Sequence, residues 1–303
     1  MREFFTLFLK GVAMGAANVI PGVSGGTIAL ITGIFERLID ALKSFDAKAV
    51  KYLFTWKIKE LIVHIDFWFL LTVFSGVGIA IISLARLFEF LFLNYPVFIW
   101  SFFFGLVLAS VYFVGKTIKN WDISVIVSFV VGTAVAIAIS VLNPASENDN
   151  FIYLLFCGVV AVCSMILPGL SGSFVLILLG NYQLVMITAV NEMNLIILLP
   201  IVLGAGVGLI AFSHGLSWLL KKFHNQTLAT LTGFILGSLG ILWPWKNIIE
   251  QNFGDKVKAV GYDWFFPEIN SSFFIALFFM VLGIVAIWFT EYFGAIKEKS
   301  PDA

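Results

Sequence analysis

An apolar segment interrupted in its middle by Pro-Gly occurs twice in the chain, and this repeat constrains the fold more than any other feature. The copies run from Gly11 to Phe35 and from Gly158 to Tyr182. Proline fixes its own φ and lacks an N–H, while glycine permits φ values that side chains forbid, so a helix should end inside each copy and a second begin. Aligned without a gap, the copies share Gly11/Gly158, Val12/Val159, Pro21/Pro168, Gly22/Gly169, Ser24/Ser171, Gly25/Gly172 and Gly33/Gly180.

The composition indicates the solvent in which these broken helices fold. Of the 303 residues, 60% are hydrophobic and 12% are charged, whereas soluble domains carry about 25% charged residues. We therefore predict an all-α integral membrane protein. Cys157 and Cys163 lie too far apart along one helical run for a disulfide. No motif for a metal, a cofactor, nucleic acid or an enzyme active site is present, so no cofactor is expected.

The first broken segment is too short to cross a bilayer before it breaks. Residues 4–17 would form about 21 Å of helix, against a hydrocarbon core of about 30 Å. After the break, Glu36 and Arg37 mark a return to an interface. We interpret residues 4–42 as a re-entrant hairpin with its tip at Pro21, and residues 151–190 as a second one. Such backbone is tolerated in a membrane only where it is buried in protein or lines a wet cavity.

The remaining chain supplies a surface helix and six spans. Residues 48–60 mix lysines with aromatic residues, which is typical of a helix lying among headgroups. Residues 243–272 are interpreted as a polar loop. We predict repeat 1 over 1–146, with spans at 67–93, 97–114 and 123–142, and repeat 2 over 147–303, with spans at 195–220, 228–242 and 273–289.

Charge placement favours re-entrant hairpins over full crossings. With both termini cytoplasmic, all Lys and Arg outside the spans lie inside except Lys246, Lys256 and Lys258, as expected for short loops. Three spans, an odd number, separate the hairpins, so the second enters from the opposite side. We therefore expect inverted repeats whose tips meet near the midplane. Many secondary transporters share this architecture, although channels and some membrane enzymes also use re-entrant segments.

The tips are candidate anion sites. The first N–H groups of a helix lack intrahelical partners, and small residues leave them accessible, which suits phosphate. The alternative is that these residues merely permit close helix packing. The candidates are Pro21, Gly22, Ser24, Gly25 and Gly26 in the first copy and Pro168, Gly169, Ser171, Gly172 and Ser173 in the second.

Ionisable residues near or within the spans are further candidates. Arg86 and Glu89 share one helix face toward the outer leaflet, and charges within spans are functional candidates by default. The alternative is a pair that reaches the outer headgroups. Glu192 is expected at the outer mouth of the second hairpin. The carboxylates of Glu89, Glu192 and Asp66 are the candidates for ion coupling, and Arg86 is a candidate phosphate ligand.

At NVIPGVSGGTIALITGIFERLI and MILPGLSGSFVLILLGNY the chain resembles the PopT-type polyprenyl-phosphate transporter family. The resemblance implies a flippase that moves undecaprenyl phosphate, the lipid carrier for cell-wall polymers, from the outer to the inner leaflet of the bacterial cytoplasmic membrane for reuse. The tip residues are the matching positions. The second copy departs at Ser173 and Phe174, where the first has Gly26 and Thr27, so the halves need not bind equally.

Two other functions fit the same pattern. A coupled importer of a small soluble anion would use the same fold and differ in whether its cavity opens sideways to lipid. A membrane enzyme acting on a lipid phosphate would release inorganic phosphate. For the lipid transporter, moving an anion inward costs about 2.3 kcal/mol per charge per 100 mV. A co-transported H⁺ or Na⁺ would offset that cost.

Overall fold

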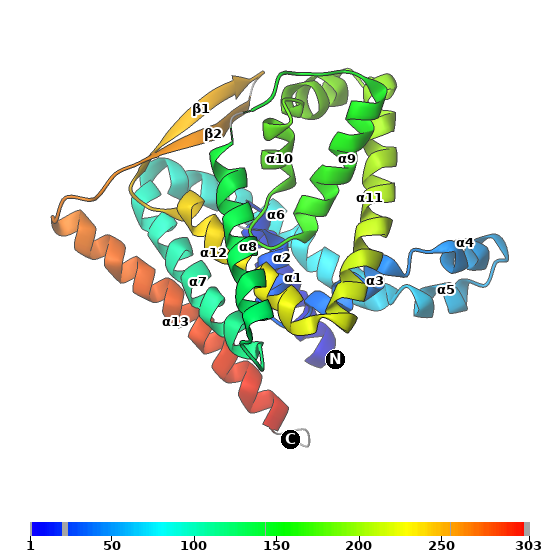
Figure 1. The fold of residues 1–303 in the computed structure, drawn as a ribbon, viewed down its shortest axis with the longest axis horizontal. Coiled ribbons are helices and arrows are strands. Elements are labelled where there is room, and N and C mark those ends of the chain that lie inside the picture. The colour runs from blue at the N-terminus through cyan, green and yellow to red at the C-terminus, as the bar shows by residue number, and fades with distance from the viewer. Residues whose placement is uncertain (1, 20–23, 143, 255, 300–303) are drawn as a thin grey trace.

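The protein is a helical bundle with one small β-hairpin (Figure 1). The computed structural model describes residues 2–19, 24–142, 144–254 and 256–299. The first half contains α1 (Arg2–Val19), α2 (Gly25–Ile31), α3 (Phe35–Lys43), α4 (Ala47–Phe54), α5 (Ile58–His64), α6 (Phe67–Asn94), α7 (Pro96–Thr117) and α8 (Ile123–Val141). The second contains α9 (Phe151–Ile166), α10 (Gly172–Leu178), a π-helix η1 (Leu184–Ala189), α11 (Leu195–Lys222), α12 (His224–Leu242), β1 (Lys246–Phe253), β2 (Lys256–Trp264) and α13 (Ser271–Lys299).

Both predicted helix breaks are confirmed. A first arm, α1 or α9, ends at the motif, and a second arm of seven residues, α2 or α10, begins just after the conserved serine position of the repeat. Each second arm then ends at the last shared glycine. Gly33 has φ +71° and Gly180 has φ +74°, a conformation that side chains rarely adopt. The sequence identity between the copies thus extends to their backbone geometry.

Close glycine contacts join each first arm to the long helix that follows its hairpin. A Cβ added at Gly11 of α1 would overlap the backbone of Val73 on α6, and one added at Gly158 of α9 would overlap the backbone of Ile201 on α11. Small residues let apolar helices approach closely, and dispersion contacts then hold them together where water cannot. The shared glycine pair at the start of the repeat therefore has the same packing role twice.

The other spans pair between the halves. Gly105 of α7 packs on the backbone of Met280 in α13, and Gly132 of α8 packs on the backbone of Thr230 in α12. In the two predicted repeats, α7 is equivalent to α12 and α8 is equivalent to α13. The α7–α13 pair is therefore equivalent to the α12–α8 pair, as a two-fold relation between the halves requires. Figure 1 shows α1 entering from the lower end and α9 from the upper end.

Five helices in the described residues are long and apolar enough to cross a membrane: α6, α7, α8, α11 and α13. They contain five of the six predicted spans. The sixth, 228–242, lies in α12, which begins with the polar residues His224, Asn225 and Gln226. Of its 19 residues, 13 are buried because it packs against both α7 and α8.

Two local predictions were wrong. Residues 243–272 are not simply a polar loop, because β1 and β2 form an antiparallel hairpin there, with Gly254 at φ +56° near the turn. The single surface helix over 48–60 is instead two helices, α4 and α5, separated at Trp56, whose φ is +54°. The left-handed backbone at Trp56 ends α4, and the N–H of Lys57 bonds back to the carbonyl of Tyr52 at 2.9 Å.

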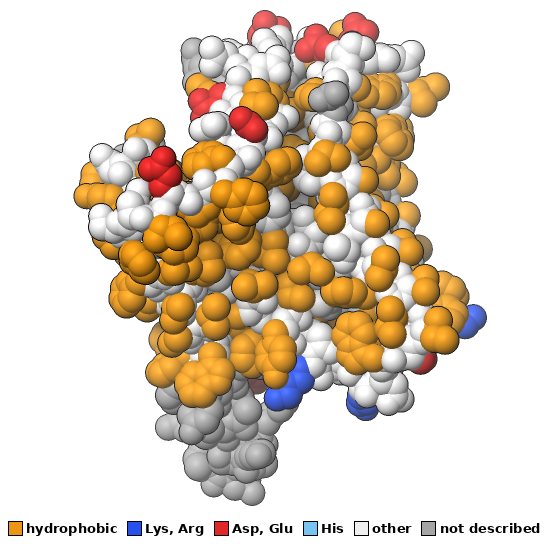
Figure 2. All heavy atoms as spheres, turned by 60° about the vertical axis from the view of Figure 1, so that its left-hand side comes forward, with side chains coloured by type: hydrophobic (Ala, Val, Ile, Leu, Met, Phe, Trp, Pro, Cys, Tyr) orange, Lys and Arg blue, Asp and Glu red, His pale blue; other side chains and the backbone are white. Residues whose placement is uncertain are grey.

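The surface is divided into an apolar band and two polar ends. Figure 2 shows Asp and Glu gathered at the upper end and the visible Lys and Arg at the lower end, with hydrophobic side chains between them. The start of α1 and the end of α13 also lie at the lower end (Figure 1). An apolar band between polar ends is the surface that a lipid bilayer requires.

We predict that Gly105→Leu destabilises the fold by about 1–3 kcal/mol, because the added side chain overlaps rigid backbone in α13. Gly78→Leu on α6 is the matched control, since a Cβ at Gly78 meets nothing within 4 Å. Thermal unfolding of both variants in the same detergent checks this. Equal midpoints for the two variants would contradict the packing role of Gly105.

Candidate functional site between the two broken helices

The tips of the two broken helices contact each other in their described residues. The hydroxyl of Ser24 donates to the carbonyl oxygen of Leu167 at 3.2 Å. The backbone N–H of Gly169 donates to the hydroxyl oxygen of Thr27 at 3.0 Å. Ser24 is 4% exposed and Thr27 is 1% exposed, so these bonds are shielded from water. The described residues next to the two tips thus lie in contact, while the meeting of Pro21 with the second tip near the midplane stays a prediction.

In the first copy, most candidate donors already have partners. Ser24 caps α2 by accepting from the N–H of Thr27 at 3.3 Å, and the side-chain oxygen of Asn18 accepts from the N–H of Gly25 at 2.8 Å. A Cβ at Gly26 would overlap the carbonyl oxygen of Ile166. Gly25 and Gly26 thus have close neighbours, as a packing role requires, and their part in anion binding stays a prediction. Pro21 and Gly22 lie outside the described residues.

In the second copy, the hydroxyls are less constrained. Ser171 occupies the position before α10 but makes no capping bond, and its hydroxyl lies 3.0 Å from that of Ser173. Both residues are half-buried. Because one hydroxyl in such a pair donates, the other retains a proton for a ligand. The expectation that the two copies differ in their chemistry at Ser173 agrees with this geometry.

The other residues of the second copy are held by close contacts. Pro168 is buried, and Gly169 adopts φ +80°, with the carbonyl of Phe234 2.7 Å from where a Cβ would lie. A Cβ at Gly172 would lie 2.6 Å from the side chain of Met165. These three positions set the path of the backbone, and the serines beside them carry the polar groups.

Among the described side chains, the hydrogen bonds at this contact involve no charged candidate. Arg86 and Glu89 lie on α6, with side chains outside the described residues. Asp66, at the start of α6, is bound by the guanidinium of Arg37 through contacts of 2.7 and 3.2 Å. Glu192 is exposed after η1. As a coupling group, Asp66 would have to leave Arg37.

A polar cluster that includes Glu36, predicted only to mark an interface, joins the halves. Asp40 of α3 accepts from the hydroxyl of Ser217 at 2.7 Å and from Lys221 at 3.0 Å. Glu36 lies 2.9 Å from the imidazole of His224. The signal was the four-residue spacing of Glu36 and Asp40, which places two acids on one helix face. This cluster ties α3 to α11 and α12.

Lys246 is a second residue whose role the sequence did not reveal. Its amino group lies 3.6 Å from the centre of the Trp100 ring and 5.1 Å from that of Tyr262, and it donates to the carbonyl of Ile241. Burial lowers the pKa of Lys246 to about 7, while the aromatic rings favour its charged form. Lys246 lies on β1 and Tyr262 on β2. Their contact could not be predicted from the sequence because the β1–β2 hairpin was not predicted.

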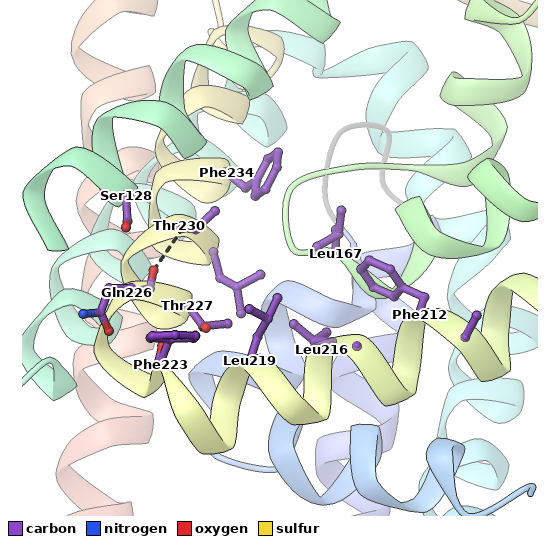
Figure 3. A pocket seen from close by; sticks show the side chains of 13 residues that line it. Ser128, Leu167, Phe212, Leu216, Leu219, Phe223, Gln226, Thr227, Thr230 and Phe234 are labelled. Atoms are coloured by element: carbon purple, nitrogen blue, oxygen red, sulfur yellow. Dashed lines mark hydrogen bonds between the residues drawn. The ribbon is translucent and has the colours of Figure 1, made fainter. Parts of the chain in front are cut away.

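A pocket of about 580 Å³ lies beside the tip contact, between α8, α11 and α12 (Figure 3). Leu167, whose carbonyl accepts from Ser24, contributes its side chain to the wall. The lining is mainly apolar, with a few hydroxyl and amide groups toward α8. The lining residues are Ser128, Leu167, Ala211, Phe212, Gly215, Leu216, Leu219, Phe223, Gln226, Thr227, Thr230, Leu231 and Phe234.

We predict that Thr27→Val lowers the free energy of unfolding by about 1–3 kcal/mol, because it leaves the buried N–H of Gly169 without its acceptor. Thr232→Val is the control, since that equally buried hydroxyl bonds only to Leu228 in its own helix. Thermal unfolding of the two variants measures the difference. If Thr232→Val lowers the free energy of unfolding as much as Thr27→Val does, the bond between the halves adds no stability beyond that of an ordinary buried hydroxyl.

Comparison with known proteins places this arrangement in a family. The family described as undecaprenyl phosphate translocase-like matches residues 14–260. A polyprenyl-phosphate transporter of Vibrio cholerae is 43% identical over 261 residues, covering 85% of this chain and 83% of the relative. One of Staphylococcus aureus is 31% identical over 263 residues, covering 80% of this chain and 88% of the relative. No solved structure gives a significant match. The chain belongs to the undecaprenyl phosphate translocase-like family.

Proposed function

We propose that this protein transports a polyprenyl phosphate across the bacterial cytoplasmic membrane. The observation that carries the proposal is the family match over residues 14–260, which includes both helix breaks and the contact between them. Two relatives that cover most of the chain are named polyprenyl-phosphate transporters. The apolar band between polar ends fits an integral membrane location.

Undecaprenyl phosphate is the substrate we infer, moved from the outer to the inner leaflet for reuse in cell-wall polymer synthesis. The anionic headgroup is the part that lipid does not accept, so the protein has to supply a polar path for it. The chain of the lipid is apolar and can remain at the edge of the protein. A protein of this family therefore needs a small polar site with an opening toward lipid.

The architecture we infer for this task is an inverted repeat of two re-entrant hairpins, with both termini cytoplasmic. Three observations support it: the equivalent glycine contacts in the two halves, the exchange-symmetric pairing of α7 with α13 and α8 with α12, and the entry of α1 and α9 from opposite ends. The Lys and Arg visible at the lower end support a cytoplasmic location for that end.

We infer that the phosphate is held at the two P-G-x-S-G tips, with Arg86 as a further ligand. Ser171 and Ser173 are its best-placed hydroxyls, because they bond to one another rather than across the halves. Ser24 and Thr27 would instead set the spacing of the tips. The two halves would thus contribute unequally to one site.

Inward movement of the anion requires compensation, since the interior is electrically negative. The cost is about 2.3 kcal/mol per charge per 100 mV, so one H⁺ or Na⁺ carried per phosphate charge would cancel it. Glu89 and Glu192 are the carboxylates to test first. Asp66 ranks below them because Arg37 already occupies it.

A headgroup-accessibility assay in liposomes tests the function directly. The purified chain should transfer undecaprenyl phosphate between leaflets, faster when a pH or sodium gradient opposes the charge cost. Empty liposomes are the control. Absence of transfer under every gradient would refute the transporter proposal, and release of inorganic phosphate would assign an enzyme instead. Uptake of free phosphate without lipid transfer would support an importer of a small soluble anion.

We predict that Arg86→Ala reduces transfer more than Arg86→Lys. Arginine presents a planar fork of donors to phosphate, whereas lysine keeps only the charge. The rate of transfer at matched protein abundance in liposomes measures the effect. If Arg86 only anchors α6 at the headgroups, both variants should transfer at the wild-type rate.

We also predict that the two serine positions behave differently. Ser171→Ala should raise the substrate concentration for half-maximal transfer by roughly tenfold, with little loss of stability, since one buried hydrogen bond to a charged group contributes about 1.5–3 kcal/mol. Ser24→Ala should mainly lower the unfolding temperature, because it removes a bond between the halves. Equal effects of both substitutions on both readouts would overturn this division of roles.

A further inference from the structure

The pocket between α8, α11 and α12 is elongated, because its lining residues follow one face of α11. Ala211, Gly215 and Leu219 follow one another at four-residue intervals, so they form a single stripe along α11. Thr227, Leu231 and Phe234 face them from α12. The pocket therefore follows the diverging pair of helices away from their junction at Phe223 (Figure 3). Its volume of about 580 Å³ falls within the range of about 300–1,000 Å³ of ligand pockets.

The pocket reaches the contact between the two tips. Figure 3 shows Leu167 and Phe234 at one end, and Phe223 and Gln226 toward the other. The backbone carbonyl of Leu167 accepts from Ser24, so one residue belongs both to the wall of the pocket and to the tip contact. An apolar chain attached to a phosphate at the tips would therefore meet this pocket first.

The pocket is also open sideways. Leu219 is 39% exposed and Phe223 is 40% exposed, and both lie on its wall. Ala211 and Gly215, farther along the same stripe of α11, are exposed as well, so the opening continues along the apolar part of the helix away from Lys221 and Lys222. A long chain can thus lie partly inside the pocket and continue into the bilayer. A small soluble anion has no use for such a wall, because the side chains along α11 give it no hydrogen bonds.

We propose that this pocket binds the isoprenoid units next to the phosphate of the substrate lipid, while the phosphate itself lies at the tips. The inference rests on the proposed function and adds a second subsite to it. The polar groups at the α8 side are already paired, since Gln226 donates to Ser124 at 2.9 Å and Thr230 donates to the carbonyl of Gln226 at 2.9 Å. They leave the interior apolar, as an isoprenoid chain requires.

A pair of glycines on α11 provides a matched test. An added Cβ meets nothing within 4 Å at either Gly215 or Gly206, so both positions accept a side chain without backbone overlap. Gly215 lines the pocket, whereas Gly206 is not among its lining residues. Gly215→Leu should therefore fill the pocket, and Gly206→Leu should leave it unchanged. Both substitutions exchange the same residue types within the same helix.

The readout is the inhibition of undecaprenyl phosphate transfer by farnesyl phosphate, with the full chain in phospholipid liposomes. Gly215→Leu should weaken this inhibition by at least about tenfold, as expected when a pocket loses space for a few carbon atoms. Gly206→Leu should match the wild type. An unchanged inhibition constant in Gly215→Leu would refute the proposal that the pocket binds the isoprenoid chain. In that case, transfer by the wild type would still support the proposed function. Absence of wild-type transfer would refute the function itself.

A labelling experiment keeps the proposal testable if Gly215→Leu does not fold. Gly215→Cys and Gly206→Cys would be reacted with a membrane-permeant maleimide, with the unsubstituted chain as background for Cys157 and Cys163. Farnesyl phosphate should slow labelling at Gly215→Cys by several-fold, and methyl phosphate should not. Equal labelling rates with and without farnesyl phosphate would show that the pocket holds only bulk lipid, and would overturn the proposal.

Discussion

The structure depends on hydrogen bonds that satisfy broken helices in an apolar environment. A helix that ends within a bilayer leaves backbone groups without water to bind, and each such group costs several kcal/mol. Here the Gly169 N–H finds the hydroxyl of Thr27, and the Leu167 carbonyl finds that of Ser24. The second break is thus completed by the first half, whereas Asn18 and Ser24 satisfy N–H groups at the start of α2 within the first copy. The second hairpin therefore depends on the hydroxyls of Ser24 and Thr27 for two of its backbone hydrogen bonds.

Much of the fold follows from the sequence because its strongest signals are local. Pro-Gly within an apolar run predicts a helix break, and the breaks after α1 and α9 confirm this. Long apolar runs predict spans, and five of the long helices are long and apolar enough to cross a membrane. The β-hairpin was missed because the charged residues among 243–272 suggested a polar loop, although Gly254-Asp255 between β-prone residues was a usable turn signal. The left-handed residue Trp56, which divides the surface helix, has no sequence signal of that kind.

The site was less predictable because it depends on contacts between distant residues. The repeat identified Ser24 and Ser171 as equivalent, yet one bonds across the halves and the other to Ser173. Their different environments come from Leu167 and Thr27, which a comparison of the two copies cannot bring together. Likewise, the sequence did not reveal that Asp66 forms an ion pair with Arg37, because the two residues lie 29 positions apart in the chain. The pocket could not be anticipated, since its walls come from three helices of both halves.

The cluster of Asp40, Ser217 and Lys221 has a mechanical consequence. Asp40 is 48% exposed and Lys221 is 62% exposed in their side chains, so water can replace the bonds between them at little cost. The bonds between the tips are buried and have no such substitute. Within the cluster only the pair of Asp40 and Lys221 is open to water, since Ser217, which also donates to Asp40, is 1% exposed. Salt would therefore weaken the attraction between Asp40 and Lys221 while leaving the buried bonds between the tips unchanged, so added salt should loosen the join of α3 to α11 before it affects the centre of the molecule.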